Sequence, residues 1–80
     1  MYLYELKEGE TATVINIKTV GSLRRRLFDM GLIEGTKIKC VFKSPFGDPT
    51  AFLFRGSLIS LRRNDSKNIT VKGELPWPIK

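Results

Sequence analysis

The fold of this chain is decided by residues 22–32, SLRRRLFDMGL, whose apolar side chains repeat like a helix while the flanking segments alternate like strands. We expect Ser22 to cap the first turn by accepting a backbone N–H. Gly31 is placed to end the helix in the left-handed conformation, and a Schellman ending would fold Leu32 back onto Leu27. The stretch therefore predicts one short helix with a defined residue at each end.

This helix has two different faces when its residues are spaced at about 100°. Arg24, Arg25 and Phe28 fall on one side, which packing against a core does not explain. The opposite stripe, which we expect to face the core, consists of Leu23, Leu27 and Met30. One face of the helix is therefore predicted to hold the fold together, and the other is a candidate surface for a partner.

The segments around the helix are predicted to form about five short strands. Gly9 and Gly35 each follow an acidic residue and are placed for the positive φ of a type II turn before a strand. Alternation fails at residues 14–15, which predicts a bulge, whereas Ile38, Cys40 and Phe42 share one side of a regular strand and are expected to face the core. The strands are expected at residues 11–18, 37–43, 50–54, 58–62 and 68–72, with a tight hairpin turn at Arg55-Gly56.

These elements predict a mainly β protein, a small closed barrel of about five strands with one short α-helix inserted after the first long strand. An 80-residue chain supports a single core, because a domain of this size buries only about 60 to 65% of its unfolded surface. We expect the barrel to occupy residues 1–72 and residues 73–80, which contain Trp77 between two prolines, to form an extended tail.

The composition excludes several classes of function. One cysteine rules out a disulfide framework within the chain, and the absence of histidine removes a common transition-metal ligand. The acidic residues are scattered, so we predict no metal site, no cofactor and no catalytic group, and expect a protein that is not an enzyme. A net charge of +6 suits an acidic protein, a nucleic acid or an anionic membrane surface. No apolar run is long enough to span a bilayer and no signal peptide is visible, so we expect a cytoplasmic protein.

The order and spacing of several short motifs resemble the ferrous iron transport protein A (FeoA) family. The motifs are LKEGE at 6–10, RRL at 25–27, MGL at 30–32, EG at 34–35, SPFGDP at 44–49, ISLRR at 59–63 and ITV at 69–71. The resemblance implies an SH3-like barrel. It also implies a small accessory protein of bacterial ferrous iron uptake, which binds and regulates FeoB, a membrane transporter with a cytoplasmic GTP-binding domain, at the inner face of the membrane.

The first candidate site is the helix face formed by Arg24, Arg25 and Phe28, because arginine beside an aromatic residue is typical of interface anchors. On this hypothesis the face binds an acidic surface of the transporter. The alternative is a solvated basic face, on which Arg25 or Arg26 pairs with Asp29 and Phe28 lies over a neighbouring loop.

The second candidate is the loop at residues 44–49, where an SH3-like fold could bind a proline-rich peptide if aromatic residues line a groove. Phe46, with Tyr2 or Tyr4, could supply that lining, and we expect Arg55 and Arg62 nearby. The alternative is a turn stiffened by proline that only fixes the barrel geometry. The loop residues in question are Pro45, Phe46, Asp48 and Pro49.

The third candidate is a nucleic-acid surface, because a basic barrel is a common format for RNA binding. The basic residues that would form it are Lys37, Lys39, Lys43, Arg62 and Arg63. Against this alternative, the sequence shows no basic cluster with regularly interleaved aromatic residues.

Overall fold

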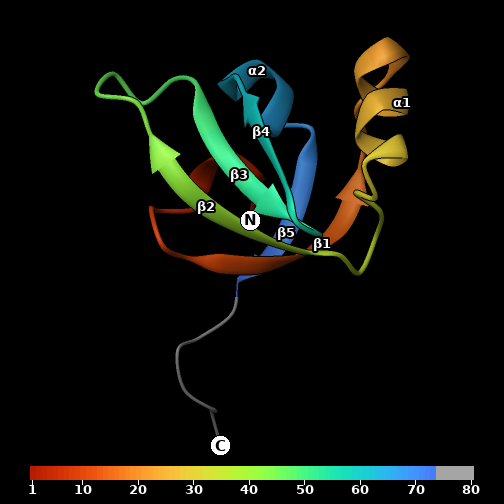
Figure 1. Ribbon diagram of the computed structural model, residues 1–80, viewed down its shortest axis with the longest axis horizontal. Helices are drawn as coiled ribbons and strands as arrows, with labels where there is room; N and C mark the ends of the chain where they lie inside the picture. Colours follow the sequence, from red (N-terminus) through yellow and green to blue (C-terminus); the bar gives the residue numbers. More distant parts are fainter. Residues whose placement is uncertain (74–80) are drawn as a thin grey trace, which may run out of the picture.

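A computed structural model describes residues 1–73 of the chain (Figure 1). Of the tail expected at 73–80, Gly73 instead belongs to the last strand, and residues 74–80 lie outside the described residues. The elements are η1 (Leu3–Glu5), β1 (Thr11–Ile17), α1 (Gly21–Asp29), β2 (Lys37–Lys43), β3 (Thr50–Phe54), β4 (Ser57–Leu61), α2 (Arg63–Ser66) and β5 (Ile69–Gly73). The prediction of a mainly β fold with one short helix after the first long strand is confirmed. The 3₁₀ turn η1 was not anticipated.

The five strands form one antiparallel sheet in the order β4-β3-β2-β1-β5. The sheet curves around the core, and α1 stands beside it at the end of β1 (Figure 1). At one end of the ladder, Met1 exchanges two backbone hydrogen bonds with Val71 of β5, at 2.8 and 3.1 Å. At the other end β4 continues into α2, which leads back to β5. The N-terminal segment therefore covers the outer edge of β5.

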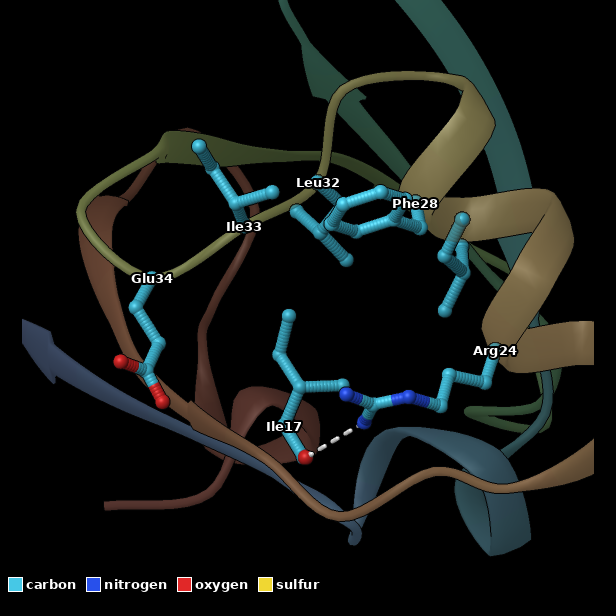
Figure 2. Close-up of a pocket in the computed structure, with 7 residues that line it drawn as sticks. Ile17, Arg24, Phe28, Leu32, Ile33 and Glu34 are labelled. Atoms are coloured by element: carbon cyan, nitrogen blue, oxygen red, sulfur yellow. Dashed lines mark hydrogen bonds between the residues drawn. The ribbon is translucent and has the colours of Figure 1, made fainter.

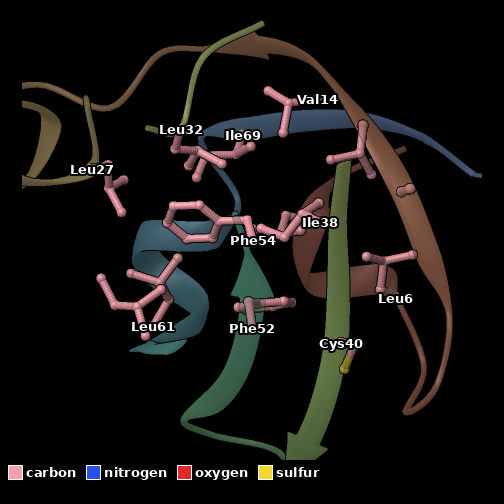
Figure 3. Packing of buried hydrophobic residues seen from close by; sticks show 14 residues of the cluster. Leu6, Val14, Leu27, Leu32, Ile38, Cys40, Phe52, Phe54, Leu61 and Ile69 are labelled. Atoms are coloured by element: carbon pink, nitrogen blue, oxygen red, sulfur yellow. The ribbon is translucent and has the colours of Figure 1, made fainter. Parts of the chain in front are cut away.

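The core lies inside this curved sheet and combines side chains from the strands, η1 and the helix (Figure 3). Leu27 of α1 and Leu32 directly after it are both buried, and Leu23 and Met30 pack partly buried against the same cluster. The buried apolar residues are Leu3, Leu6, Ala12, Val14, Leu27, Leu32, Ile38, Cys40, Phe52, Phe54, Ile59, Leu61, Ile69 and Val71. The predicted core stripe of the helix is confirmed.

The C-terminal end of α1 is the predicted Schellman motif. Gly31 has φ +97°, its N–H donates to the Phe28 carbonyl at 3.0 Å, and the Leu32 N–H donates to the Leu27 carbonyl at 2.9 Å. The N-terminal prediction is wrong. Gly21, with φ +77°, already turns the chain into the helix, so Val20 occupies the capping position and no side chain caps the first turn.

The two glycine turns are confirmed. The turn at Gly9 leads into β1 and is hydrogen-bonded to β2, and the turn at Gly35 leads into β2 and is hydrogen-bonded to β1. Gly9 and Gly35 have φ values of +88° and +93°. The Gly9 N–H donates to the carbonyl of Cys40 in β2, and the Gly35 N–H donates to the carbonyl of Val14 in β1, both at 2.7 Å. The hairpin turn at Arg55-Gly56 is also confirmed, since both residues have positive φ, as a type I′ turn requires.

Two bulges interrupt the sheet, and only one of them was predicted. The register of β1 against β5 shifts between Val14 and Asn16, as the broken alternation indicated. A second shift separates Cys40 from Phe42 in β2, and it leaves Phe42 54% exposed. The prediction that Phe42 faces the core is therefore wrong, because the extra residue of a bulge reverses the side of the sheet on which the next side chain lies.

Candidate functional site

The helix face predicted from the sequence is present on the surface of α1. Arg24, Arg25 and Phe28 are all exposed, and 63% of the Phe28 surface is accessible. The Arg24 guanidinium is held in place by its Nη1, which donates to the Ile17 carbonyl at 3.1 Å (Figure 2). The same Nη1 also donates to the Thr19 carbonyl at 3.4 Å. Arg24 thus ties α1 to the end of β1, while Arg25 on the same face makes no such hydrogen bond to residues 1–73.

A hollow of about 290 Å³ lies between this face and the turn that follows the helix. Figure 2 shows Arg24 and Glu34 at its two ends, with the apolar side chains of Ile17, Phe28 and Leu32 between them. Its lining consists of Ile17, Arg24, Leu27, Phe28, Leu32, Ile33 and Glu34. The site is therefore a depression with apolar side chains in its middle and one positive and one negative end, an arrangement that could hold an apolar side chain of a partner.

Phe28 also borders a second hollow, of about 410 Å³, on the outer side of the helix. Arg24 and Phe28 line both hollows, and Arg25 and Asp29 line only the second one. Phe28 and Arg24 thus form a ridge between two depressions.

The alternative interpretation of this face, a solvated basic surface with Arg–Asp pairs and Phe28 over a loop, is supported only in part. Among residues 1–73, Asp29 forms no ion pair with Arg25 or Arg26. Phe28 does approach a neighbouring loop, because it lines the same hollow as Ile33 and Glu34. Sequence reasoning missed the loop side of this site, since Ile33 and Glu34 belong to no periodic pattern and reach the helix only through the fold.

The loop at residues 44–49 is held by its own hydrogen bonds. The N–H and hydroxyl of Ser44 both donate to the Pro49 carbonyl, at 3.2 and 2.9 Å, and the Gly47 N–H donates to the Ser44 carbonyl at 2.7 Å. Asp48 accepts the backbone N–H of Arg63 at 2.9 Å and so holds the start of α2. These contacts favour the structural interpretation of Asp48 and Pro49.

The aromatic residues expected to line a groove beside this loop do not meet in any of the three hollows described for residues 1–73. Phe46 is 96% exposed and Pro45 is exposed, and neither lines one of these three hollows. Arg55 does not lie near the loop either, because its side chain packs against Gly31 at the opposite end of β3. The loop contributes only Gly47 to a third hollow, of about 410 Å³, between η1 and α2.

Two of the five basic residues considered for nucleic acid lie together at one hollow. Lys43 and Arg63 both line the third hollow, whereas Lys37, Lys39 and Arg62 do not. Arg63 stacks on Tyr4, with its guanidinium carbon 4.5 Å from the ring centre. Sequence reasoning missed this contact, because no local signal links residues 4 and 63.

Cys40 is fully buried, as predicted. Burial raises the pKa of its thiol, nearby Lys43 lowers it, and Glu8 and Glu10 add to the increase. A buried thiol with a raised pKa is a poor nucleophile.

Within residues 1–73, no group of three or more cysteine or acidic side chains is arranged to hold a metal ion. In the same part of the chain, no helix combines the length and the apolar character needed to cross a bilayer.

Comparison with known proteins gives a consistent result. Residues 1–73 match the FeoA domain. The Fe(2+) transport protein A/Fe(2+) transporter FeoB fusion protein of Porphyromonas gingivalis is 33% identical over 72 residues, which are 90% of this chain and only 8% of the fusion protein. An Fe(2+) transport protein A of Campylobacter jejuni is 30% identical over 71 residues, which are 89% of this chain and 96% of that protein.

Solved structures show the same relationship. The FeoA protein of Chlorobium tepidum superimposes with a TM-score of 0.87 at 38% identity, covering 98% of this chain and 81% of that one. The zinc complex of Stenotrophomonas maltophilia FeoA, described as a prokaryotic SH3 domain protein, has a TM-score of 0.78 at 26% identity, covering 90% of this chain and 89% of that one. The expected SH3-like fold is therefore confirmed.

Proposed function

Because this chain belongs to the FeoA family, we propose that it acts in the cytoplasm as a non-enzymatic accessory of ferrous iron uptake, binding a FeoB-type transporter and regulating it. The family membership supports a role in ferrous iron transport. The direct contact with the transporter and the regulation of its activity are the two testable parts of this proposal.

The observation that carries the proposal is the fusion protein of Porphyromonas gingivalis, in which an FeoA-like segment and a FeoB transporter share one chain. The relative from Campylobacter jejuni matches this chain over 96% of its own length, so the domain also occurs as a separate protein. A covalent link raises the effective concentration of two modules that interact weakly. The two arrangements together support an interaction between the domain and the transporter.

We assign the contact to the face of α1 that carries Arg25 and the Phe28 ridge. Phe28 offers an exposed aromatic ring between two hollows, and arginine and aromatic residues supply much of the binding energy in protein interfaces. The net charge of +6 would accelerate association with an acidic surface of the transporter.

The test is a titration of the transporter's purified cytoplasmic domain with this protein and with an Arg25→Glu/Phe28→Ala double variant. Arg24 is kept, because its hydrogen bonds to the carbonyls of Ile17 and Thr19 support the fold. Losing an aromatic anchor and reversing one charge should weaken binding at least about tenfold. Native affinity in the double variant would exclude the α1 face.

Two control variants locate the contact. Phe46→Ala removes an aromatic ring that is 96% exposed on the loop at 44–49, and Arg62→Glu reverses a charge that is exposed next to α2. Both should bind within about twofold of the native protein if α1 carries the contact. A selective loss in Phe46→Ala would move the site to the loop.

Regulation is tested separately by measuring GTP hydrolysis by the transporter with and without this protein. Replacing Arg24, Arg25 and Arg26 one at a time by alanine asks whether an arginine of α1 contributes to hydrolysis, since an arginine placed at the transferred phosphoryl group raises GTPase rates by orders of magnitude. If hydrolysis is the same with and without the protein, regulation at this step is excluded.

A further inference from the structure

A third hollow, of about 410 Å³, lies between η1 and α2 and shares no residue with the two hollows beside α1. It is lined by Tyr4, Glu5, Lys43, Gly47, Thr50, Arg63 and Ser66. Its lining thus brings together two cations and an aromatic ring from three separate parts of the chain.

Tyr4 orients the first cation. The Arg63 guanidinium lies over the Tyr4 ring with its carbon 4.5 Å from the ring centre, and the same ring stacks on Tyr2 with a centre separation of 5.8 Å and an angle of 8°. A guanidinium that stacks through its face keeps its N–H groups at the edge, where they match the two oxygens of a carboxylate.

The second cation is positioned by the backbone of the same residue. The Lys43 Nζ donates to the Tyr4 carbonyl at 3.2 Å, and an ammonium group has three donors, so two remain for another acceptor. Lys43 is half-buried, which limits the motion of its side chain. Both cations are therefore held around Tyr4 instead of moving freely in solvent.

Glu5 lines this hollow, and it and two nearby acidic residues each accept a hydrogen bond from a backbone N–H. Glu5 accepts the N–H of Tyr2 at 2.6 Å, Glu8 accepts the N–H of Lys43 at 2.7 Å, and Asp48 accepts the N–H of Arg63 at 2.9 Å. In the described part of the chain, neither Lys43 nor Arg63 forms an ion pair. The hollow thus holds two oriented cations with no carboxylate bound to them.

We propose that this hollow binds a carboxylate from an acidic segment of a protein partner, as a second contact separate from the α1 face. The inference rests on the proposed function only in taking a protein as the partner. A single-stranded nucleic acid fits the hollow less well, because such strands stack on successive aromatic rings. Tyr4 already contacts Tyr2 and Arg63, and Phe46 does not line the hollow.

The proposal is tested with a fluorescein-labelled hexaglutamate peptide, titrated with the full chain at low ionic strength and followed by fluorescence anisotropy. Arg63→Gln and Lys43→Gln should each weaken binding about fivefold, as expected for a partly exposed ion pair. The matched control is Arg62→Gln, which removes the same charge from the neighbouring exposed residue outside the hollow and should change binding by less than about twofold.

A second readout locates the peptide on the protein. Amide NMR shifts at Tyr4, Lys43 and Arg63 should move on titration, and the spectrum of each variant shows that it is folded. If Arg62→Gln and Arg63→Gln weaken peptide binding equally, or if the amide shift changes spread over the whole surface, the peptide is held by general charge attraction. Either result would overturn the proposal.

Two further experiments separate this site from its alternatives. Phe28→Ala should leave hexaglutamate binding unchanged, so the hollow can be confirmed even if α1 does not bind the transporter. An oligothymidylate that binds more tightly than hexaglutamate and depends on Arg63 would identify a nucleic-acid site, and the carboxylate proposal would then be wrong.

Discussion

The side chain of Arg55 lies directly across Gly31, so that a Cβ at position 31 would stand 2.6 Å from the Cδ and 2.9 Å from the Nε of Arg55. Gly31 ends α1, and Arg55 belongs to the hairpin turn between β3 and β4. The residue that ends the helix is thus also where the helix meets the hairpin. Glycine is favoured here by its positive φ, and a residue with a Cβ would also have to displace the flexible side chain of Arg55.

The replacement Gly31→Ala should therefore destabilise the protein by more than backbone strain alone. A positive φ costs a residue with a Cβ about 1–2 kcal/mol, and displacing the Arg55 side chain adds to that loss. Gly47→Ala is the matched control, because Gly47 has φ +81° but no atom within 4 Å of the added Cβ. Urea denaturation of both variants measures the difference, and equal losses would show that Arg55 moves aside freely.

Arg55→Ala in the Gly31→Ala background should recover part of the lost stability, since it removes the side chain that the new methyl group meets. The four proteins of this double-mutant cycle give the coupling free energy between the two positions. We expect a favourable coupling of about 0.5 kcal/mol or more. Additive effects would mean that the contact contributes nothing to the choice of glycine.

Leu27→Ala should cost about 2–5 kcal/mol in the free energy of unfolding, because Leu27 is buried and truncation leaves a cavity between α1 and the strands. Leu23→Ala removes the same group from a half-buried position on the same stripe and should cost clearly less. Thermal or urea unfolding checks both values. A larger loss in Leu23→Ala would contradict the assignment of Leu27 as the central helix contact.

Asp48→Ala should lower stability by about 0.5–1.5 kcal/mol, because the start of α2 loses the carboxylate that accepts the Arg63 N–H. Asp29→Ala is the control, since Asp29 is exposed and has no hydrogen-bond partner among the described residues. Its effect should stay within about 0.5 kcal/mol. Comparable losses in the two variants would show that the contact from the loop to α2 is not structural.

Stability should fall as the pH rises above about 8.5, the ordinary pKa of a thiol, because burial raises the pKa of Cys40 in the folded state. In that range the unfolded chain has released the thiol proton while the folded chain still holds it, so the unfolded state is favoured. Cys40→Ala should remove this part of the pH dependence. Urea midpoints between pH 7 and 10 measure it, and identical slopes for the two proteins would contradict the role of Cys40.

The same burial predicts slow reaction of Cys40 with iodoacetamide in the folded protein and rapid reaction in urea. Reactivity requires the thiolate and access to it, and both are reduced when the side chain is fully buried. Rapid alkylation without denaturant would mean that the sheet opens readily around β2.

The sequence predicts the wrong local structure at two places, where more than one backbone conformation fits the local pattern. Phe42 looked like a core residue because residues 37–43 alternate without interruption, yet the bulge that exposes it is visible only in the pairing of β2 with β3. Ser22 looked like a helix cap by type and position, but the positive φ of Gly21 moved the capping position to Val20. In both cases the local sequence pattern is compatible with two backbone conformations.

The features that can be predicted from the sequence are those that depend on residues within a few positions of one another. These are the α1 stripe and its Schellman ending at Gly31, the glycine turns, the hairpin turn and the family. The candidate binding surfaces, in contrast, are formed by residues that only the folded chain brings together. Arg24 bonds to the carbonyl of Ile17, and Arg63 stacks on Tyr4, because the curved sheet brings together segments far apart in the chain. Periodicity shows which way a residue points along its own element, whereas a site depends on which other element the fold places opposite it.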